Sequence, residues 1–534
     1  VRPVRWVVVI YGEEVPAYNI LGVTSNNISR GHRFHAPADI VIQSAGSYQQ
    51  QMLDHFVVAS AADRRDSIRQ EVDDLAQRFG GRAVISERLL DEVAALNEWP
   101  VPLLGQFDDE FLQIPAEALI SAMQGHQKYF HVVDEDDKLL PAFVTVANIS
   151  SRDPAQVVAG NERVIRPRLA DAAFFYHNDL KISLEKRRQS LEKVVFQAQL
   201  GSLFDKTQRV AILCRWLATA TGGNPERAER AGLLCKSDLI SDMVGEFNDL
   251  QGTMGCYYAN NDGEHSAVAT ALYEQYLPRF SGDKIPQSAE GITLALADRI
   301  DTLVGIFSIG QQPSGSKDPF ALRRASLGLL RIIIESNIDV DLKSAMFEAA
   351  EQLPEVSNKS NNELCMQVFA YVADRFVAYY KEQGVRVESY YAVAALDLSS
   401  PLDINARVTS VHRFSLRPEA AALASANKRV ANILAKESTE NVSIKTILLK
   451  EDAEIMLAKA ILKLQVALPP LITERQYDRA LELLAELNEP IDRFFNEVMV
   501  MAEDPKVRNN RVALLQNLRC IFLDVADISL LAAS

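Results

Sequence analysis

The sequence has 534 residues, enough for roughly three or four domains, and its hydrophobic share of 48% and charged share of 24% are ordinary for a soluble globular protein. The 71 acidic and 56 basic residues give a net charge of −15, which argues against nonspecific nucleic-acid binding over the whole surface but not against a local basic patch. Five widely separated cysteines without a C-x-x-C pair argue against a zinc ribbon or a disulfide framework and favour the reducing cytoplasm. Because no apolar run approaches the ~18 residues of a membrane span, we expect a cytoplasmic protein with no membrane partner.

Residues 1–175 read as a mixed α/β domain. β-rich apolar segments predict strands at residues 4–10, 20–24, 40–43, 129–133 and 143–147, the last two forming a hairpin. Apolar residues at three- and four-residue steps predict helices between residues 50 and 95, and Gly80-Gly81 should end one of them. The chain starts without Met and inside a predicted strand, so we expect it to be a fragment of a longer protein.

A basic stretch at residues 161–176 closes this domain. Arg163, Arg166 and Arg168 crowd around Pro167, and an apolar segment rich in Ala, Phe and Tyr follows. Arginine beside aromatic rings can hold phosphates and stack on unpaired bases, although one such cluster alone is weak evidence.

Residues 176–345 read almost entirely as helix, and a second basic stretch lies at residues 310–331. Asp318 and Pro319 predict a helix start, with Asp as the N-cap and Pro at the first helical position. Lys317, Arg323 and Arg324 surround that start. A helix N-terminus with arginines suits a phosphate, and a buried helix with a few solvated arginines remains the alternative.

Residues 346–408 predict a helical body with an exposed linker at residues 353–362, and residues 409–534 form a separate helical unit. Lys428 and Arg429 lie on an Ala-rich helix predicted at residues 419–436. The last predicted helix, residues 507–525, has one apolar face, and Arg508, Arg511 and Arg519 are expected outside it. The basic clusters on separate domains fit a long, bent RNA better than a small ligand.

The motifs of nucleotide-binding and hydrolytic enzymes are missing from the sequence. It has no P-loop, no G-x-G-x-x-G after a strand, no G-x-S-x-G and no H-E-x-x-H. A His-Asp (HD) phosphohydrolase site is only partly present: Asp238, Asp298 and Asp301 are candidate ligands, but Lys236 and Ser237 stand where the adjacent His belongs. A lysine would repel a divalent ion, so we favour an HD-like helical scaffold without a metal over a metal-dependent hydrolase.

Several segments together resemble one family, the beta subunit of bacterial glycyl-tRNA synthetases. The similar segments include GNERVIRPRLADAAFFYHNDLK, FQAQLGSLFDKTQRV, AGLLCKSDLISDMVGEFNDLQGTMGCYYA, the block from LADRIDTL to SKDPFALRRASLGLLRI, ANKRVANILAK and VADISLL. They run through nearly the whole chain, and the family normally begins with a further N-terminal region.

The resemblance implies a multidomain, mainly α fold. It implies that residues 1–175 are similar to part of the phenylalanyl enzyme's beta subunit. Residues 176–345 would be an HD-like domain with a degenerate metal site, residues 346–408 a helical linker, and residues 409–534 an anticodon-binding helical domain.

The resemblance further implies a tRNA-recognising subunit of a glycine–tRNA ligase, in a heterotetramer with an alpha subunit. The alpha subunit would use ATP and Mg to make glycyl-adenylate and charge tRNA-Gly, so we expect no catalytic residue, metal or cofactor in this chain. By charge and location, the expected tRNA contacts are Arg163, Arg166, Arg168, Lys317, Arg323, Arg324, Lys428, Arg429, Arg508 and Arg511. The alternatives are an HD-type phosphohydrolase and a pure assembly scaffold for the alpha subunit.

Overall fold

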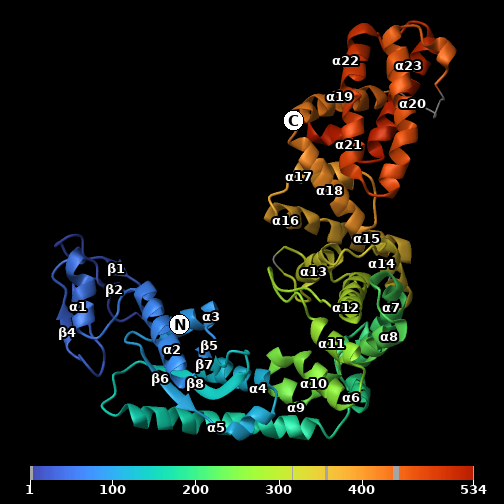
Figure 1. The fold of residues 1–534 in the computed structure, drawn as a ribbon. Coiled ribbons are helices and arrows are strands. Elements are labelled where there is room, and N and C mark those ends of the chain that lie inside the picture. The colour runs from blue at the N-terminus through green and yellow to red at the C-terminus, as the bar shows by residue number, and fades with distance from the viewer. Residues whose placement is uncertain (1–3, 316, 355–358, 437–443, 533–534) are drawn as a thin grey trace. The chain divides into compact units, whose positions relative to one another are not determined.

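A computed structural model of the protein describes residues 4–315, 317–354, 359–436 and 444–532 (Figure 1). The chain is mostly helical with small sheets, which confirms the coarse fold class. It divides into two compact units. The first comprises Val1–Arg187 and Asp238–Asn261, and the second comprises Arg188–Ser237 and Asp262–Ser534.

The first unit is built on a four-stranded antiparallel sheet with the strand order β5-β7-β8-β6. Its strands and the two helices that cover it are β5 (Arg82–Ala83), β6 (Val101–Gln106), β7 (Phe130–Val133), β8 (Leu139–Ala147), α2 (Ala61–Phe79) and α3 (Glu87–Leu96). Ile68 and Leu90 from the helices form one apolar core with Phe130 and Val144 from the sheet. The hairpin β7–β8 confirms the prediction for residues 129–133 and 143–147.

The strand predicted at residues 4–10 is wrong. Within the described chain this segment makes only a single bridge, from Val8 to Asn26, and Val4 and Trp6 stay exposed. β-rich composition does not make a strand where no neighbouring strand supplies a hydrogen-bonding partner.

The next two predicted strands are parts of small hairpins. These are β1 (Asn19–Ile20) with β2 (Val23–Thr24), and β3 (Ile28–Arg30) with β4 (Asp39–Val41). The segment 20–24 is therefore a turn and not one strand, because Leu21 and Gly22 take φ values of 51° and 82°. The helix α1 (Tyr48–Asp54) follows.

One long helix, α5 (Pro154–Asp179), carries the first basic stretch, and Pro167 lies inside it. The buried carboxylate of Asp179 fixes the end of this helix. It accepts hydrogen bonds from Arg187 Nη2 at 2.7 Å, Tyr258 Oη at 2.8 Å and two backbone N–H groups at the start of α9 (Asp242–Glu246).

The second unit begins with a helical domain around α12 (Ala289–Ser308), most of whose residues are buried. The helices that pack around it are α7 (Leu203–Thr221), α8 (Pro225–Leu234), α11 (Ser266–Glu274), α13 (Leu322–Glu335), α14 (Leu342–Glu351) and α15 (Asn361–Ala373) (Figure 1). Then come α16 (Arg375–Glu382), α17 (Val387–Ala394) and α18 (Pro401–Ser415). Part of the linker predicted at 353–362 lies outside the described residues, and α15 already begins at Asn361.

The start of α13 differs from the prediction. The helix begins at Leu322, after Ala321 with φ 53°, so Pro319 is not its first residue. Asp318 still caps it from a distance, since its carboxylate accepts from the backbone N–H groups of Leu322 and Arg323 at 2.8 and 3.0 Å.

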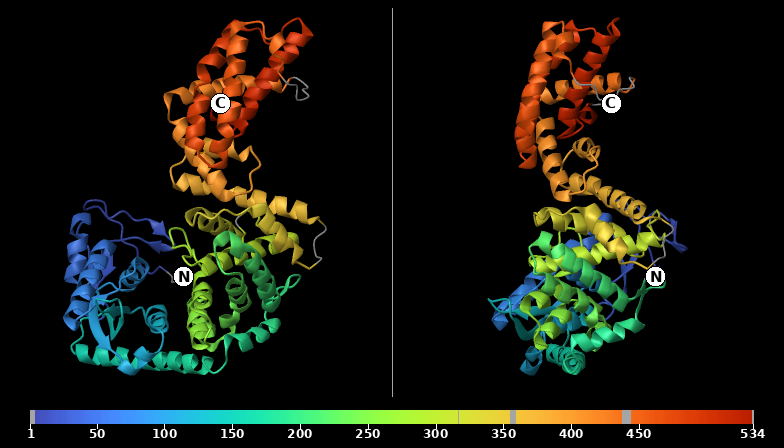
Figure 2. Two further views of the ribbon diagram at one scale, coloured as in Figure 1. Left: turned by 45° about the vertical axis from the view of Figure 1, so that its right-hand side comes forward. Right: turned by 90° about the vertical axis from the view of Figure 1, so that its right-hand side faces the viewer.

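The C-terminal helices form a bundle, which Figure 2 shows from two sides. They are α19 (Pro418–Leu434), α20 (Asp452–Thr473), α21 (Tyr477–Ala485), α22 (Asn488–Glu497) and α23 (Pro505–Leu523). By length and composition alone, α20 is apolar enough to cross a membrane. It contains two prolines and packs against α21, α22 and α23, as a helix of this bundle.

Candidate RNA-binding surfaces

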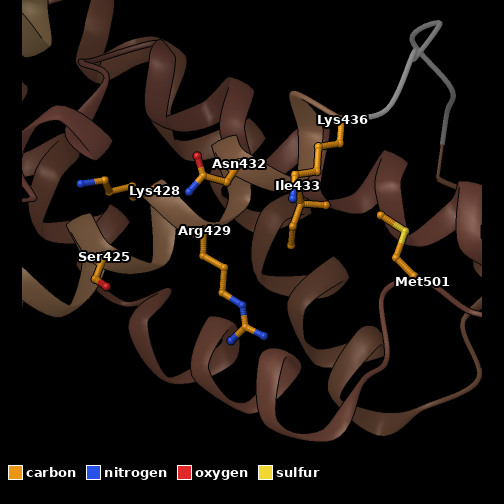
Figure 3. A pocket seen from close by; sticks show the side chains of 7 residues that line it. All are labelled: Ser425, Lys428, Arg429, Asn432, Ile433, Lys436 and Met501. Carbon is orange, nitrogen blue, oxygen red and sulfur yellow. The ribbon is translucent and has the colours of Figure 1, made fainter.

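The C-terminal bundle contains a basic pocket of about 530 Å³, drawn in Figure 3. Its lining residues are Ser425, Lys428, Arg429, Asn432, Ile433, Lys436 and Met501. All but Met501 come from one side of α19 or from just beyond its end, at steps of three and four residues. The opposite side of α19 is apolar and buried, and this burial turns Lys428 and Arg429 outward.

The pocket is suited to an anion. Lys428, Arg429 and Lys436 have no carboxylate within ion-pair distance among the described residues, so their charges add. Arg429 stacks on the Phe495 ring, with its guanidinium carbon 4.1 Å from the ring centroid, which holds the cation in place. The side chains of Ser425 and Asn432 add hydrogen-bonding groups beside the cations. Such a site can hold a phosphate next to a base.

Arg511 does not lie where the sequence predicted. It is buried, donates from Nε to Glu454 at 2.5 Å and from Nη1 to the Met499 carbonyl oxygen at 2.7 Å. Burial opposes the charge of Glu454, but the hydrogen bonds from Arg511 and from the backbone outweigh it and lower the pKa of Glu454. Arg511 therefore fixes the loop that carries Met501 into the pocket.

Arg508, one turn before Arg511 on α23, is half-buried. Its Nε is shielded from water and has no hydrogen-bond partner in the described part of the chain. Of the two predicted contacts on this helix, Arg508 alone keeps a side chain partly open to solvent.

The second predicted cluster, Lys317, Arg323 and Arg324, lies around the start of α13. Asp318 occupies the N-terminus of that helix. The first backbone N–H groups of α13, which a phosphate would need, are taken by Asp318. Arg323 hydrogen-bonds the Gly315 carbonyl oxygen, whereas Lys317 and Arg324 are exposed. The structure thus offers Lys317 and Arg324 as surface cations, while Asp318 occupies the first two backbone donors of the helix.

The three predicted arginines of α5, Arg163, Arg166 and Arg168, point to different sides of the helix. Arg163 and Arg168 are exposed, but five residues place them about 140° apart at 100° per residue. Arg166 is exposed too and lies 3.1 Å from the carboxylate of Asp108. Phe174, 65% exposed, leaves an aromatic ring on the open side of the same helix.

The core of the second unit contains buried lysines beside two of the three aspartates that the sequence offered as metal ligands. Lys206 Nζ lies 3.0 Å from Asp298 and 2.9 Å from Asp301, and Lys236 Nζ lies 3.0 Å from Asp298. Burial opposes these charges, yet the mutual attraction raises the pKa of Lys236 and holds the pKa of Asp298 far below its usual value. The two lysine ammonium groups therefore form ion pairs with the carboxylates that a metal ion would need as ligands.

The third aspartate is engaged elsewhere. Asp238 accepts from the backbone N–H groups of Gly252 and Gly255 at 2.6 and 3.2 Å, and so caps α10 (Thr253–Asn261). Across the described ranges, no three His, Cys, Asp or Glu side chains gather where they could hold a metal.

Sequence reasoning named two of the seven pocket residues and missed the others. Lys436 and Asn432 follow Lys428 at steps of four residues, and this spacing on a predicted helix was a usable signal. Met501 lies beyond α22 in a loop that Arg511 holds, and nothing in the local sequence marked it.

Two family models match the chain. Residues 1–395 match the glycyl-tRNA synthetase beta subunit, and residues 423–528 match the DALR anticodon binding domain. The second match contains α20 to α23, most of α19 and the basic pocket.

Curated relatives agree with these matches. A "Glycine--tRNA ligase beta subunit" of Marinobacter nauticus is 52% identical over 99% of this chain and 77% of the relative. Proteins with the same name from Chromohalobacter salexigens and Ectopseudomonas mendocina are each 50% identical over 99% of this chain and 77% and 78% of the relatives. The chain therefore belongs to the glycyl-tRNA synthetase beta subunit family and carries a DALR-type anticodon-binding domain at its C-terminal end.

Proposed function

We propose that this chain recognises tRNA-Gly for a glycine–tRNA ligase in which a separate alpha subunit, using ATP and Mg, attaches the glycine. The observation that supports this role most strongly is the basic pocket on α19, since it lies inside the segment that matches an anticodon-binding domain. Three cations that have no carboxylate partner among the described residues lie beside hydrogen-bonding side chains, and they suit the phosphates and bases of a single-stranded loop. In this proposal the assembly is a cytoplasmic heterotetramer.

The mechanism is one of positioning. Lys428 and Arg429 hold the anticodon loop, and Lys317, Arg323 and Arg324 provide charge for the RNA backbone on the HD-like domain. Arg163, Arg166 and Arg168 form a further basic surface on α5, within a domain similar to part of the phenylalanyl enzyme's beta subunit. Arg508 flanks the C-terminal domain. Arg511 is not among the proposed tRNA contacts, because its guanidinium forms a buried ion pair with Glu454.

A phosphohydrolase role has less support. Lys206 and Lys236 bind the aspartates that a metal would use, so we propose an HD-like scaffold without a metal.

Binding of tRNA-Gly to the alpha–beta complex, measured by filter binding at several salt concentrations, tests the proposal. Lys428→Ala with Arg429→Ala should weaken binding roughly tenfold to a hundredfold, since each phosphate contact is lost with its counterion release. Lys463→Ala, on an exposed lysine of α20 that pairs with Glu486, is the matched control and should bind as the unchanged protein does.

The α13 cluster is tested separately. Arg323→Ala with Arg324→Ala should lower affinity for any tRNA with little change in sequence preference. If neither double variant changed tRNA binding, these cations would be solvated surface residues that do not contact RNA. The chain would then be an assembly scaffold for the alpha subunit.

A further inference from the structure

The loop between α11 and α12 presents an exposed aromatic ring beside the cations of α13. Arg324 Nη1 on α13 lies 3.5 Å from the carbonyl oxygen of Arg279, and Arg331 Nη2 donates to the carbonyl oxygen of Asp283 at 2.9 Å. These two contacts attach the loop to α13 at both ends of residues 279–283. Phe280 stands between them with 65% of its surface exposed.

Arg279 carries a charge that its own surroundings do not neutralise. Its Nε and Nη2 are shielded from water and have no hydrogen-bond acceptor in the described ranges, where no carboxylate lies within ion-pair distance of it either. Its guanidinium carbon lies 5.9 Å from the centroid of the Tyr273 ring, which is 41% exposed. Two of its three nitrogens are thus buried donors without an acceptor, which is unfavourable.

The carboxylates that contact this loop and Arg331 have hydrogen-bond donors of their own, including Glu382, whose Oε1 accepts from the Ser281 hydroxyl at 2.9 Å. Asp283 accepts from the backbone N–H groups of Arg279 at 2.7 Å and of Lys284 at 2.9 Å, and Glu335 pairs with Arg331 at 2.7 Å. Arg324 is exposed and has no ion pair among the described residues. The surface therefore combines an exposed and a half-buried guanidinium, each without a carboxylate partner in the described ranges, with an open aromatic face.

We propose that Tyr273, Arg279, Phe280 and Arg324 form a binding site for one unpaired nucleotide of the bound tRNA. The base stacks on Phe280, and the phosphate lies beside Arg279 and Arg324. A base inside a duplex has both faces covered by its neighbours, so a protruding phenylalanine selects an unpaired base. This inference rests on the proposed function for its RNA, and it adds a stacking site outside the anticodon-binding domain.

Binding of a tRNA-Gly transcript to the alpha–beta complex, measured against salt, tests this assignment. Phe280→Ala should lower affinity about tenfold without changing the slope of log K against log salt, because stacking releases no counterion. Phe280→Trp should restore affinity. Arg324→Ala should reduce the slope by about one. Tyr391→Ala, on a ring that is 51% exposed on α17, is the matched control and should have no effect.

A photo-crosslinking amino acid at position 280 locates the contact. A crosslink to an unpaired nucleotide of tRNA-Gly supports the assignment. A crosslink to a base-paired segment would overturn it. Unchanged affinity of Phe280→Ala would also overturn it, and if Lys428→Ala with Arg429→Ala still weakened binding, the proposed function would stand without this site. If the unchanged complex did not bind tRNA-Gly, both proposals would fail together.

Discussion

At the scale of single residues, the buried Lys236 lies between Asp298 at 3.0 Å and the side-chain oxygen of Gln275 at 2.8 Å. Lys236→Met should destabilise the chain by about 3–5 kcal/mol, because Asp298 would lose one of its two buried counter-charges. Urea denaturation followed by circular dichroism measures this.

Lys284→Met, at an exposed lysine of the same unit, is the control and should cost at most about 0.5 kcal/mol. A chelator should leave both transitions unchanged. A chelator-sensitive transition would contradict the lysine-for-metal interpretation.

His131 on β7 predicts a pH dependence of stability. Burial, assisted by the charge of Arg82, lowers the pKa of His131 from its ordinary 6.5 to about 4. Between these values the unfolded chain binds a proton that the folded chain does not, so stability falls as pH is lowered from 6.5 towards 4, by about 3 kcal/mol. The variant His131→Gln should lose this part of the slope in denaturation curves from pH 4 to 7. An identical slope in the variant would show that His131 is not held neutral.

At the scale of elements, the link between α20 and α23 depends on Arg511 and Glu454. Arg511→Met should destabilise the C-terminal bundle by about 3–5 kcal/mol, since Glu454 would be left buried and unpaired. Adding Glu454→Leu should recover most of that loss, because an apolar pair needs no counter-charge. Urea denaturation of the three variants measures the difference. If Arg511→Met left the stability unchanged but lowered the slope of log K for tRNA-Gly against log salt by about one, Arg511 would instead be a direct phosphate contact.

Another element, α13, shows how far local patterns reach. Asp318 was expected as its N-cap and does cap it, but across a turn of three residues that ends at Ala321. The Asp-Pro signal identified the capping group. The position of the first helical residue was set by the packing of Leu322 and the following apolar side chains into the core.

At the scale of the whole molecule, a chain with a net charge of −15 has to bind a polyanion through local clusters. The affinity of the alpha–beta complex for tRNA-Gly should therefore fall steeply with salt, and removing Lys428 and Arg429 together should reduce the slope of log K against log salt by about two. Binding isotherms from about 50 to 200 mM salt measure this slope. A slope unchanged in the double variant would exclude the pocket from the RNA interface.

The sequence by itself determined the family, the coarse fold and most of the helices, because these depend on local periodicity, capping and long similar segments. The apolar face of the helix predicted at residues 507–525 is confirmed by α23, in which Leu514, Leu518 and Phe522 are buried. The failed strand at residues 4–10 had the right composition, but strand formation depends on a partner that composition does not reveal.

Only the tertiary structure decided which charges are free. Arg429 and Arg511 look alike in sequence, but one stacks at the edge of a pocket and the other is buried on Glu454, 57 positions away. Lys206 on α7, Lys236 in the turn after α8 and Asp298 on α12 likewise meet from three separate segments. A side chain's partners come from segments distant in sequence, so the local pattern determines its charge and helix face, and the packing of the helices determines whether that charge reaches a ligand.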